Sequence, residues 1–447
     1  MGRMQEAVLQ YRDLILEAER FLWEHPAPGY REWEADAYLK ERFEELGYQL
    51  TEPGDIPGFI TQIDTGRPGP CVLVMAEMDS LIIPGHPEAQ ADTGAVHACG
   101  HHAQGAAMVG LAAALTEPGI LNGLSGSIRL CCVPAEELIQ TTWREELRKK
   151  GTIRFFGGKI EYMYRGLFDG ADIAFMVHAS NNPDLDFTVE EGNNGCIVKN
   201  IAYEGKSAHA GGAPHQGINA LYAANLGLSA INALRETFED DKHVRVHPIV
   251  TAGGSVVNAI PDLVTMESYV RAKDLDAIIQ ANEKVNRALA GTAAAMGANV
   301  RITDRAGYAP LHCDRNLADA AILAAQEVTD PSRCAYVPNW STGCTDLGDV
   351  SCVMPTVQIN VAGATGTAHG VDFALSDPET ACVKSACMQA ELLDLLLRND
   401  AEVADEIVRR SDPPYDSIQE YLEVLEENER DARAVTYEED GTVQLKW

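Results

Sequence analysis

The order of apolar and polar positions along the chain predicts a mixed α/β protein. Short apolar runs at 71–77, 126–134 and 171–177 predict buried strands. Longer segments with apolar residues three and four positions apart predict helices, among them 103–116 and 376–398. Because strands and helices follow one another along the chain, we expect a sheet that is covered by helices.

The pattern changes near residue 195, where a set of shorter elements begins. Strands are predicted near 195–204, 246–252, 263–272 and 299–304, and helices near 216–236 and 274–296. This β-α-β-β-α-β order is that of a small ferredoxin-like α+β domain. We therefore expect a catalytic domain in two segments, an inserted domain and an acidic C-terminal appendage, at 1–193 with 306–399, at 194–305 and at 400–447.

Composition and charge limit the classes of partner. The chain has 447 residues and a formal net charge of −32, which repels nucleic acids and anionic membranes. No apolar run approaches the roughly 20 residues of a membrane span, and the first residues contain no apolar signal core. The 11 cysteines show no paired spacing, which is typical of reduced thiols in the cytosol. We predict a cytoplasmic protein with neither nucleic-acid nor membrane partners.

The candidate chemistry is concentrated in the segment His97-Ala-Cys-Gly-His-His102, between a predicted strand and a predicted helix. A thiolate and neutral imidazoles are ligands that suit zinc and similar divalent cations. Junctions between strands and helices are where α/β sheets usually carry their active-site loops. Taken alone, the segment also fits a surface loop, so its interpretation depends on the residues that follow.

Later positions supply the other side chains that a metal site needs. Glu136 and Glu137 follow a predicted strand, so one carboxylate can bind a metal while its neighbour accepts a proton. His178 ends the next strand, and His369 lies in a loop rich in Gly and Thr. The alternatives are surface acids at the start of a helix for the Glu pair and a satisfied core histidine for His178. The loop that carries Asn258 either binds a ligand or is an ordinary hairpin connection.

Seven motifs in this order resemble one enzyme family. They are Ala76–Leu81, His97–His101, Pro134–Glu137, Gly157–Ile160, Gly205–Ala210, Asn258–Asp262 and Thr345–Ser351. Together they resemble the zinc amidohydrolases and peptidases that include aminoacylases, carboxypeptidase G-like enzymes and auxin-conjugate hydrolases. Within that family the chain looks most similar to the branch of aminobenzoyl-glutamate hydrolase and β-alanyl-lysine dipeptidase. The resemblance covers about 5–398 and implies a three-layer zinc-peptidase-like catalytic domain whose insertion is a lid and dimerisation domain.

The resemblance also implies a site for two divalent ions per subunit, zinc or alternatively manganese or cobalt. The implied ligands are Cys99, His101, Glu137, His178 and His369. Glu136 would be the general base that activates water for attack on the amide of a dipeptide or an N-acyl or N-aroyl amino acid. In a homodimer formed through the inserted domain, His209 would stabilise the oxyanion in the other chain's site. Asn258 and Arg271 would bind the substrate.

The sequence departs from the family's usual pattern in three places. His102 stands where relatives often have Asp or Asn, and could be an extra ligand or lie behind the ligands. Glu77 stands where more distant relatives have a ligand His, and 139–156 is longer than in simpler members.

Two other functions remain as alternatives to metal-dependent hydrolysis. One is a catalytically silent metal-binding homologue that acts as a binding subunit, although the presence of all five ligands and the base argues against it. The other is a nucleophilic hydrolase that uses Cys99, which predicts inactivation by thiol alkylation even without metal.

Overall fold

The computed structural model describes residues 2–447; Met1, the first residue of the predicted catalytic domain, lies outside the described residues. The chain forms two compact units. The first contains the residues up to Gly192 together with Leu311–Trp340 and Thr345–Glu420. The second contains Asn193–Pro310, Ser341–Cys344 and Tyr421–Trp447.

The first unit is built on an eight-stranded mixed sheet in the order β1-β5-β2-β6-β15-β7-β13, with β14 paired to β7. The strands are β1 Phe59–Asp64, β2 Cys71–Glu77, β5 Ser127–Val133, β6 Ile173–Ser180, β7 Phe187–Asn193, β13 Leu311–His312, β14 Cys334–Ser341 and β15 Thr356–Ala362. β2 runs parallel to β5 and β6, and β6 runs parallel to β15. The carboxyl ends of these four strands therefore meet at one edge, where α/β proteins place their sites.

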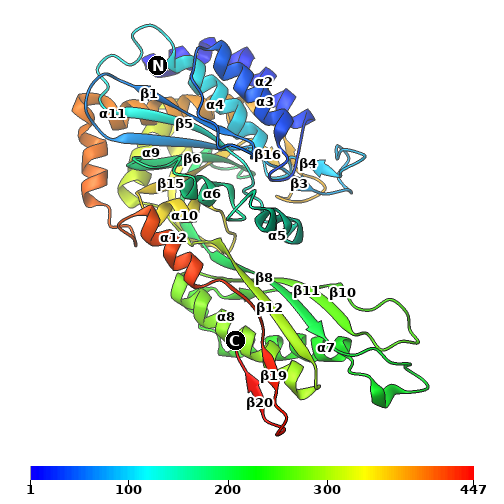
Figure 1. The fold of residues 1–447 in the computed structure, drawn as a ribbon. Coiled ribbons are helices and arrows are strands. Elements are labelled where there is room, and N and C mark those ends of the chain that lie inside the picture. The colour runs from blue at the N-terminus through cyan, green and yellow to red at the C-terminus, as the bar shows by residue number, and fades with distance from the viewer. Residues whose placement is uncertain (1) are drawn as a thin grey trace. The chain divides into compact units, whose positions relative to one another are not determined.

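Helices cover both faces of this sheet, with α4 and α11 on one face and α6 and α10 on the other (Figure 1). The helices of the unit are α1 Arg3–Gln10, α2 Arg12–Glu24, α3 Trp33–Glu45, α4 His101–Leu115, α5 Thr141–Lys150, α6 Gly158–Tyr164, α9 Arg315–Val328, α10 Leu347–Ser351 and α11 Ser385–Arg410. All 15 residues of α4 are buried, because its Ala- and Gly-rich sequence has no polar face. A Cβ atom on Gly110 would lie 2.3 Å from Cδ1 of Ile15, so glycine lets α2 pack closely against α4.

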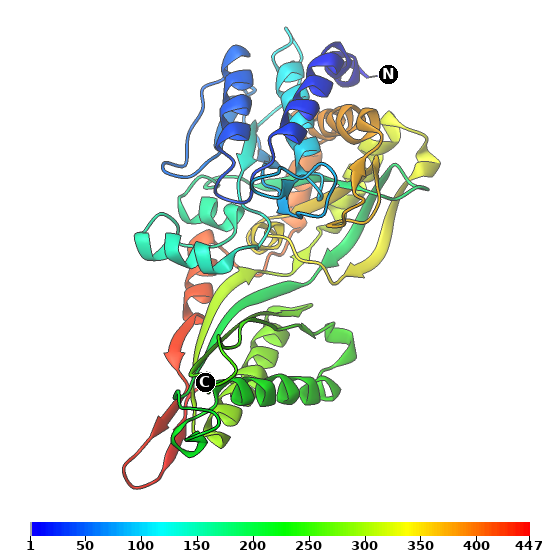
Figure 2. The same cartoon turned by 90° about the vertical axis from the view of Figure 1, so that its right-hand side faces the viewer.

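The second unit is an antiparallel sheet in the order β10-β11-β8-β12-β18, with β9 paired to β11. The elements are β8 Gly195–Glu204, α7 Ala220–Leu234, β9 Arg245–Val246, β10 Ile249–Ala252, β11 Leu263–Ala272, α8 Leu275–Ala295, β12 Asn299–Tyr308 and β18 Arg430–Arg433. In Figure 2, α7 and α8 lie on one side of this sheet. The predicted ferredoxin-like order is confirmed, and the C-terminal segment adds the edge strand β18.

Several elements differ from the pattern-based expectation. β7 and β14 were not predicted. The buried start of β7 is short and is followed by two glutamates, and β14 is mostly half-buried or exposed, so neither gives a clear apolar run. Residues 3–24 form two helices that meet at Tyr11. The predicted helix 376–398 continues as α11 past 398, after a break in which Asn399, Asp400 and Ala401 have left-handed φ angles. The remaining elements are β3 Leu81–Ile82, β4 Ala95–Val96, β16 Ala364–Thr365, β17 Ala374–Leu375, α12 Ile418–Glu427, β19 Val435–Tyr437 and β20 Val443–Leu445. No helix in the described part of the chain has the length and apolar character that crossing a membrane requires.

Candidate metal centre

Cys99 lies at the centre of a cluster of candidate metal ligands in the first unit. Its Sγ atom is 3.4 Å from Nε2 of His178 and 3.3 Å from Nε2 of His369. Cys99 forms one group with His101 and His178 and a second group with Glu137 and His369, and the ligand atoms of each group lie within 4.8 Å of one another. Ligands bound ~2.0–2.3 Å from one tetrahedral ion are about 3.3–3.8 Å apart. The structure thus brings together all five residues that the sequence suggested as ligands.

The first loop of the cluster turns at Gly100, which has a φ of 87°. A Cβ atom there would lie 2.8 Å from Cβ of Ala179, so only glycine fits between the first loop and the end of β6. His369 also has a left-handed φ, of 62°, and its N–H donates to the carbonyl of Ala98 at 2.9 Å. A backbone hydrogen bond therefore attaches the last ligand loop to the first.

The loop that carries Glu136 and Glu137 is held from both sides. Ala135 has a φ of 61°, and its N–H donates to Oε1 of Glu32 at 2.8 Å. The buried guanidinium of Arg144 on α5 donates to the carbonyls of Glu137, of Ala135 at 3.4 Å and of Phe156 at 2.6 Å. The 139–156 segment, whose role the sequence did not indicate, thus holds the backbone of the two glutamates in place.

Asp79 connects two of the candidate ligands. Its Oδ2 accepts the N–H of Glu137 at 2.8 Å, and Nδ1 of His101 lies 3.2 Å from its Oδ1 and 3.0 Å from its carbonyl oxygen. Because Nδ1 of His101 donates to these oxygens, Nε2 is the atom left to bind a metal. Among the described residues, the buried Nε2 of His101 and Oε1 of Glu137 make no hydrogen bond, although Oε2 of Glu77 and Nε2 of His369 lie 3.2 Å from them, respectively. Unpartnered buried polar atoms are costly, so the donor set fits a bound cation.

A second set of buried groups lies beside these ligands. The ammonium of Lys159 donates to Oε1 of Glu77 and to Oδ1 of Asp346, and the backbone N–H of Lys159 donates to Oδ2 of Asp346 at 2.9 Å. Oε2 of Glu77 is 3.2 Å from Nε2 of His101 and accepts a hydrogen bond from Gln104 at 2.7 Å. Lys159 and Asp346 both belong to motifs that the sequence marks, but their pairing was not predicted, because 187 residues separate them.

Burial and neighbouring charge set the pKa values in the site. Burial raises the pKa of the Cys99 thiol well above its ordinary value, and the carboxylate of Glu137 adds to the effect. Burial, Glu77 and Glu137 together raise the pKa of Glu136. Burial alone would raise the pKa of Glu77, but the charges of Lys159 and His101 outweigh it and lower this pKa to about 2. Glu136 therefore holds a proton more readily than an ordinary glutamate, whereas Glu77 holds one less readily.

His102 lies apart from the candidate ligand groups of the described residues. Its Nε2 is 3.5 Å from Oε1 of Glu19, and its ring packs edge-on against Trp23 with the centroids 4.9 Å apart. Burial, followed by the charge of His101, lowers the pKa of His102 to about 3. These contacts favour a neutral histidine packed behind the ligand loop.

Three predicted site residues belong to the second unit. His209 is exposed, and its Nδ1 accepts the N–H groups of Gly211 at 3.2 Å and Gly212 at 2.9 Å. The carbonyl of Asn258 accepts the N–H of Ala210 at 2.9 Å, so the loops that carry His209 and Asn258 lie side by side. Arg271 lies on β11, where its guanidinium is 3.5 Å from the carbonyl of Thr342.

Comparison with known proteins agrees with this fold and cluster. Residues 73–394 match the family described as Peptidase family M20/M25/M40. The chain is 27% identical over 338 residues to an N-acetyl-L-cysteine deacetylase of Bacillus subtilis, with 71% of this chain and 74% of the relative covered. It is 24% identical over 437 residues to a p-aminobenzoyl-glutamate hydrolase chain of Escherichia coli, with 90% and 81% covered.

Among solved structures, the fold is shared with a dinuclear metal binding peptidase of the M20 family from Bacillus subtilis. The TM-score is 0.65 at 24% identity, with 87% of this chain and 99% of the other covered. Fold, site and relatives define a hydrolase that acts on amide and peptide bonds. Within that class, the chain belongs to peptidase family M20/M25/M40.

Proposed function

We propose that this chain is a metal-dependent amidohydrolase that cleaves the amide of an N-acyl or N-aroyl amino acid or of a dipeptide. The observation that supports it most strongly is Cys99, which belongs to two candidate ligand groups at once, with the carboxylate of Glu136 beside them. Oε2 of Glu136 lies 4.0 Å from Nε2 of His101, close to the ligands but outside hydrogen-bond distance. A carboxylate placed in this way is free to move a proton.

Two divalent ions would be held by Cys99, His101, Glu137, His178 and His369. When bound, they supply Lewis-acid polarisation of the amide carbonyl and acidification of a water molecule. The thiolate and the imidazoles favour zinc, and the carboxylate also suits manganese or cobalt. Burial raises the pKa of Cys99 and so favours the protonated thiol. A bound divalent ion would favour the thiolate form instead.

Glu136 would act as general base and then as general acid. It takes one proton from the attacking water, whose oxygen forms the new bond to the amide carbon. As the carbon–nitrogen bond breaks, Glu136 gives that proton to the leaving amine. The pKa of Glu136 is raised above the ordinary value of a glutamate by burial and by the neighbouring carboxylates, which makes this carboxylate a stronger base toward the attacking water.

His209 would donate a hydrogen bond to the oxyanion of the partner subunit's reaction. Two backbone N–H groups occupy its Nδ1, so a neutral His209 carries its proton on Nε2, where it can serve as a donor. Asn258, on the adjacent loop, would bind the substrate's carbonyl or carboxylate. Arg271 is the second candidate for the substrate carboxylate.

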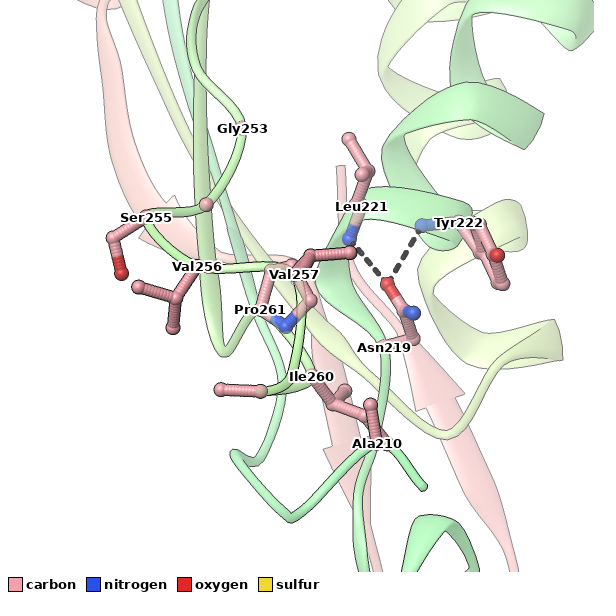
Figure 3. A pocket seen from close by; sticks show the side chains of 12 residues that line it. Ala210, Asn219, Leu221, Tyr222, Gly253, Ser255, Val256, Val257, Ile260 and Pro261 are labelled. Atoms are coloured by element: carbon pink, nitrogen blue, oxygen red, sulfur yellow. Dashed lines mark hydrogen bonds between the residues drawn. The ribbon is translucent and has the colours of Figure 1, made fainter.

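We also propose that the second unit forms a homodimer. Its α7 and β10 region exposes large apolar side chains: Tyr222 is 61% exposed, Ile249 60%, Val256 57% and Val257 99%. Figure 3 shows Val256 and Val257 beside the start of α7, where Asn219 caps the helix by accepting the N–H groups of Leu221 and Tyr222. All four residues of the edge strand β10 are exposed, and contiguous apolar surface of this kind is typical of a contact between proteins.

The cytoplasm is the proposed compartment. All 11 cysteines are free, and most of them are buried. Free thiols in this number are typical of a reducing environment.

The test of the proposed function is hydrolysis of a panel of N-acetyl amino acids, aminobenzoyl-glutamate and β-alanyl dipeptides, with and without EDTA. We expect EDTA to abolish turnover, and Glu136→Gln to lower kcat by about 10²–10⁴-fold with bound metal unchanged. Glu146→Gln, the same change at an exposed glutamate of α5, should leave kcat unaltered. Bound metal without turnover of any substrate would instead favour a silent binding subunit, and alkylation-sensitive turnover that needs no metal would favour a Cys99 nucleophile.

A further inference from the structure

Lys159 lies at the start of α6 with its side chain fully buried, at 0% exposure. Its ammonium contacts the carboxylates of both Glu77 and Asp346, which come from the end of β2 and from the residue before α10. The backbone N–H of Lys159 binds the second oxygen of Asp346 at 2.9 Å. One residue thus joins three separate segments at the edge of the sheet.

The surroundings of this ammonium have the composition of a cation site. Glu77, Glu136 and Asp346 each offer a carboxylate oxygen, and these oxygens lie within 4.8 Å of one another. Such an oxygen set suits a cation like Mn²⁺ or Mg²⁺. In this protein the Lys159 ammonium contacts two of the three carboxylates, Glu77 and Asp346. A side chain of the protein therefore supplies the positive charge that a metal ion would otherwise bring.

The position of this cation matters to the neighbouring ligands. Glu77 lies 3.2 Å from Nε2 of His101, so an uncompensated Glu77 carboxylate would be free to bind at the metal centre in place of the intended ligands. Asp346, if not bound by Lys159, would add another negative charge beside Glu136. The Lys159 ammonium donates hydrogen bonds to Glu77 and Asp346 but not to Glu136.

We propose that Lys159 is a positioning residue whose ammonium substitutes for a further metal ion among Glu77, Asp346 and Glu136. It fixes Glu77 and Asp346 so that they stay off the metal centre, and it leaves the Glu136 carboxylate available to the attacking water. This inference deepens the proposed function and rests on it.

The experiment compares the full chain with Lys159→Ala, Lys159→Met and the control Lys150→Met, which makes the same change at an exposed lysine. Metal per chain is counted by elemental analysis after equilibration with Mn²⁺, and kcat and KM are measured separately. Because Lys159→Ala leaves space within three carboxylates, we expect it to bind one more Mn²⁺ than the unaltered chain. Lys159→Met fills the space and should bind no extra ion.

For Lys159→Met we expect kcat to fall about 10²-fold, the cost of a misplaced catalytic group, with KM within about threefold. The control Lys150→Met should match the unaltered chain in both measurements. An unchanged Mn²⁺ count in Lys159→Ala would overturn the proposal, and so would a Lys159→Met variant that retains its kcat. A merely structural lysine would lower stability without changing the number of bound ions.

If either single variant fails to fold, Lys159→Ala combined with Asp346→Asn removes charge from both sides and is measured in the same way. It should bind no additional Mn²⁺ and still show the reduced kcat; a normal kcat in this folded variant contradicts the proposal. Failure of the proposed function is recognised separately, because it would appear as absence of hydrolysis by the unaltered chain.

Discussion

The imidazole of His101 is held by Asp79, with Nδ1 3.2 Å from Oδ1 and 3.0 Å from the carbonyl oxygen of the same residue. A carboxylate that binds the far nitrogen of a ligand histidine fixes its orientation and increases its basicity. We expect Asp79→Ala to lower metal affinity by about 10–100-fold, measured by competition with a chelator. Asp92→Ala, at an exposed site, is the control. Equal affinities in the two variants would show that Asp79 does not support the ligand.

Replacement of Cys99 should weaken both ions together, because this residue belongs to both ligand groups. In Cys99→Ser a hydroxyl replaces the thiolate. We expect metal affinity to fall by more than the about 10–100-fold that follows substitution of residues that only support the ligands. Elemental analysis after dialysis measures the ions that remain. The matched control is Cys313→Ser at a half-buried thiol outside the site. Loss of one ion with full retention of the other would show that Cys99 serves only one of the two groups.

Arg144 should contribute to stability as well as to the site. Arg144→Met removes the donor of three backbone carbonyls around the glutamate loop, of Ala135, Glu137 and Phe156. Because buried carbonyls lose their partners, we expect the free energy of unfolding to fall by about 2–4 kcal/mol, measured in urea. Lys149→Met, at an exposed position of the same helix, should change it by less than about 0.5 kcal/mol. Similar values for the two variants would contradict the role given to Arg144.

Asp186 should make stability depend on acid. Burial alone would raise its pKa, but the side chains of Arg333 and Thr329 outweigh it and lower the pKa below the ordinary aspartate value. A carboxyl group whose pKa is lower in the folded state stabilises the fold above its unfolded pKa, and this stabilisation is lost as pH falls through the folded pKa.

We therefore expect Asp186→Asn to unfold more easily than the unaltered chain at pH 7, and the difference to shrink below about pH 4. Urea unfolding at several pH values measures it. Asp184→Asn, an exposed neighbour, should show no such trend. A difference that stays constant with pH would mean that the charge of Asp186 is not what stabilises this region.

The proposed dimer predicts that a charge on its apolar surface will separate the two subunits. Val257→Glu places a charge on a side chain that is 99% exposed, and should convert dimers into monomers in light scattering after size-exclusion chromatography. Leu323→Glu, on the 56% exposed Leu323 of the first unit, should not.

If His209 serves the partner subunit, mixing inactive His209→Ala with inactive Glu136→Gln should restore about a quarter of the normal site activity, because half of random dimers are mixed and each has one complete site. No recovery in verified mixed dimers would exclude this exchange between subunits.

Part of the site was predictable because two of its candidate ligands come at the ends of buried strands. Glu137 and His178 follow apolar runs that the sequence marks clearly, and parallel strands bring such ends to one edge of a sheet. The roles of Lys159 and Arg144 were not predictable. Both are charged residues in segments that give no sign of burial, and their partners are set by three-dimensional packing that no local pattern encodes.

The attachment of His369 to the backbone of Ala98 has a consequence for how the protein matures. The imidazole and the Cys99 thiol are 270 residues apart in the chain, and Asn193–Pro310 of the second unit is synthesised between them. A nascent polypeptide emerging from the ribosome therefore has to be nearly finished before the group of Cys99, Glu137 and His369 can assemble. Any ion that this group holds would therefore be bound late in biogenesis, and a chain truncated before residue 369 would lack the imidazole nitrogen that lies 3.3 Å from Sγ of Cys99.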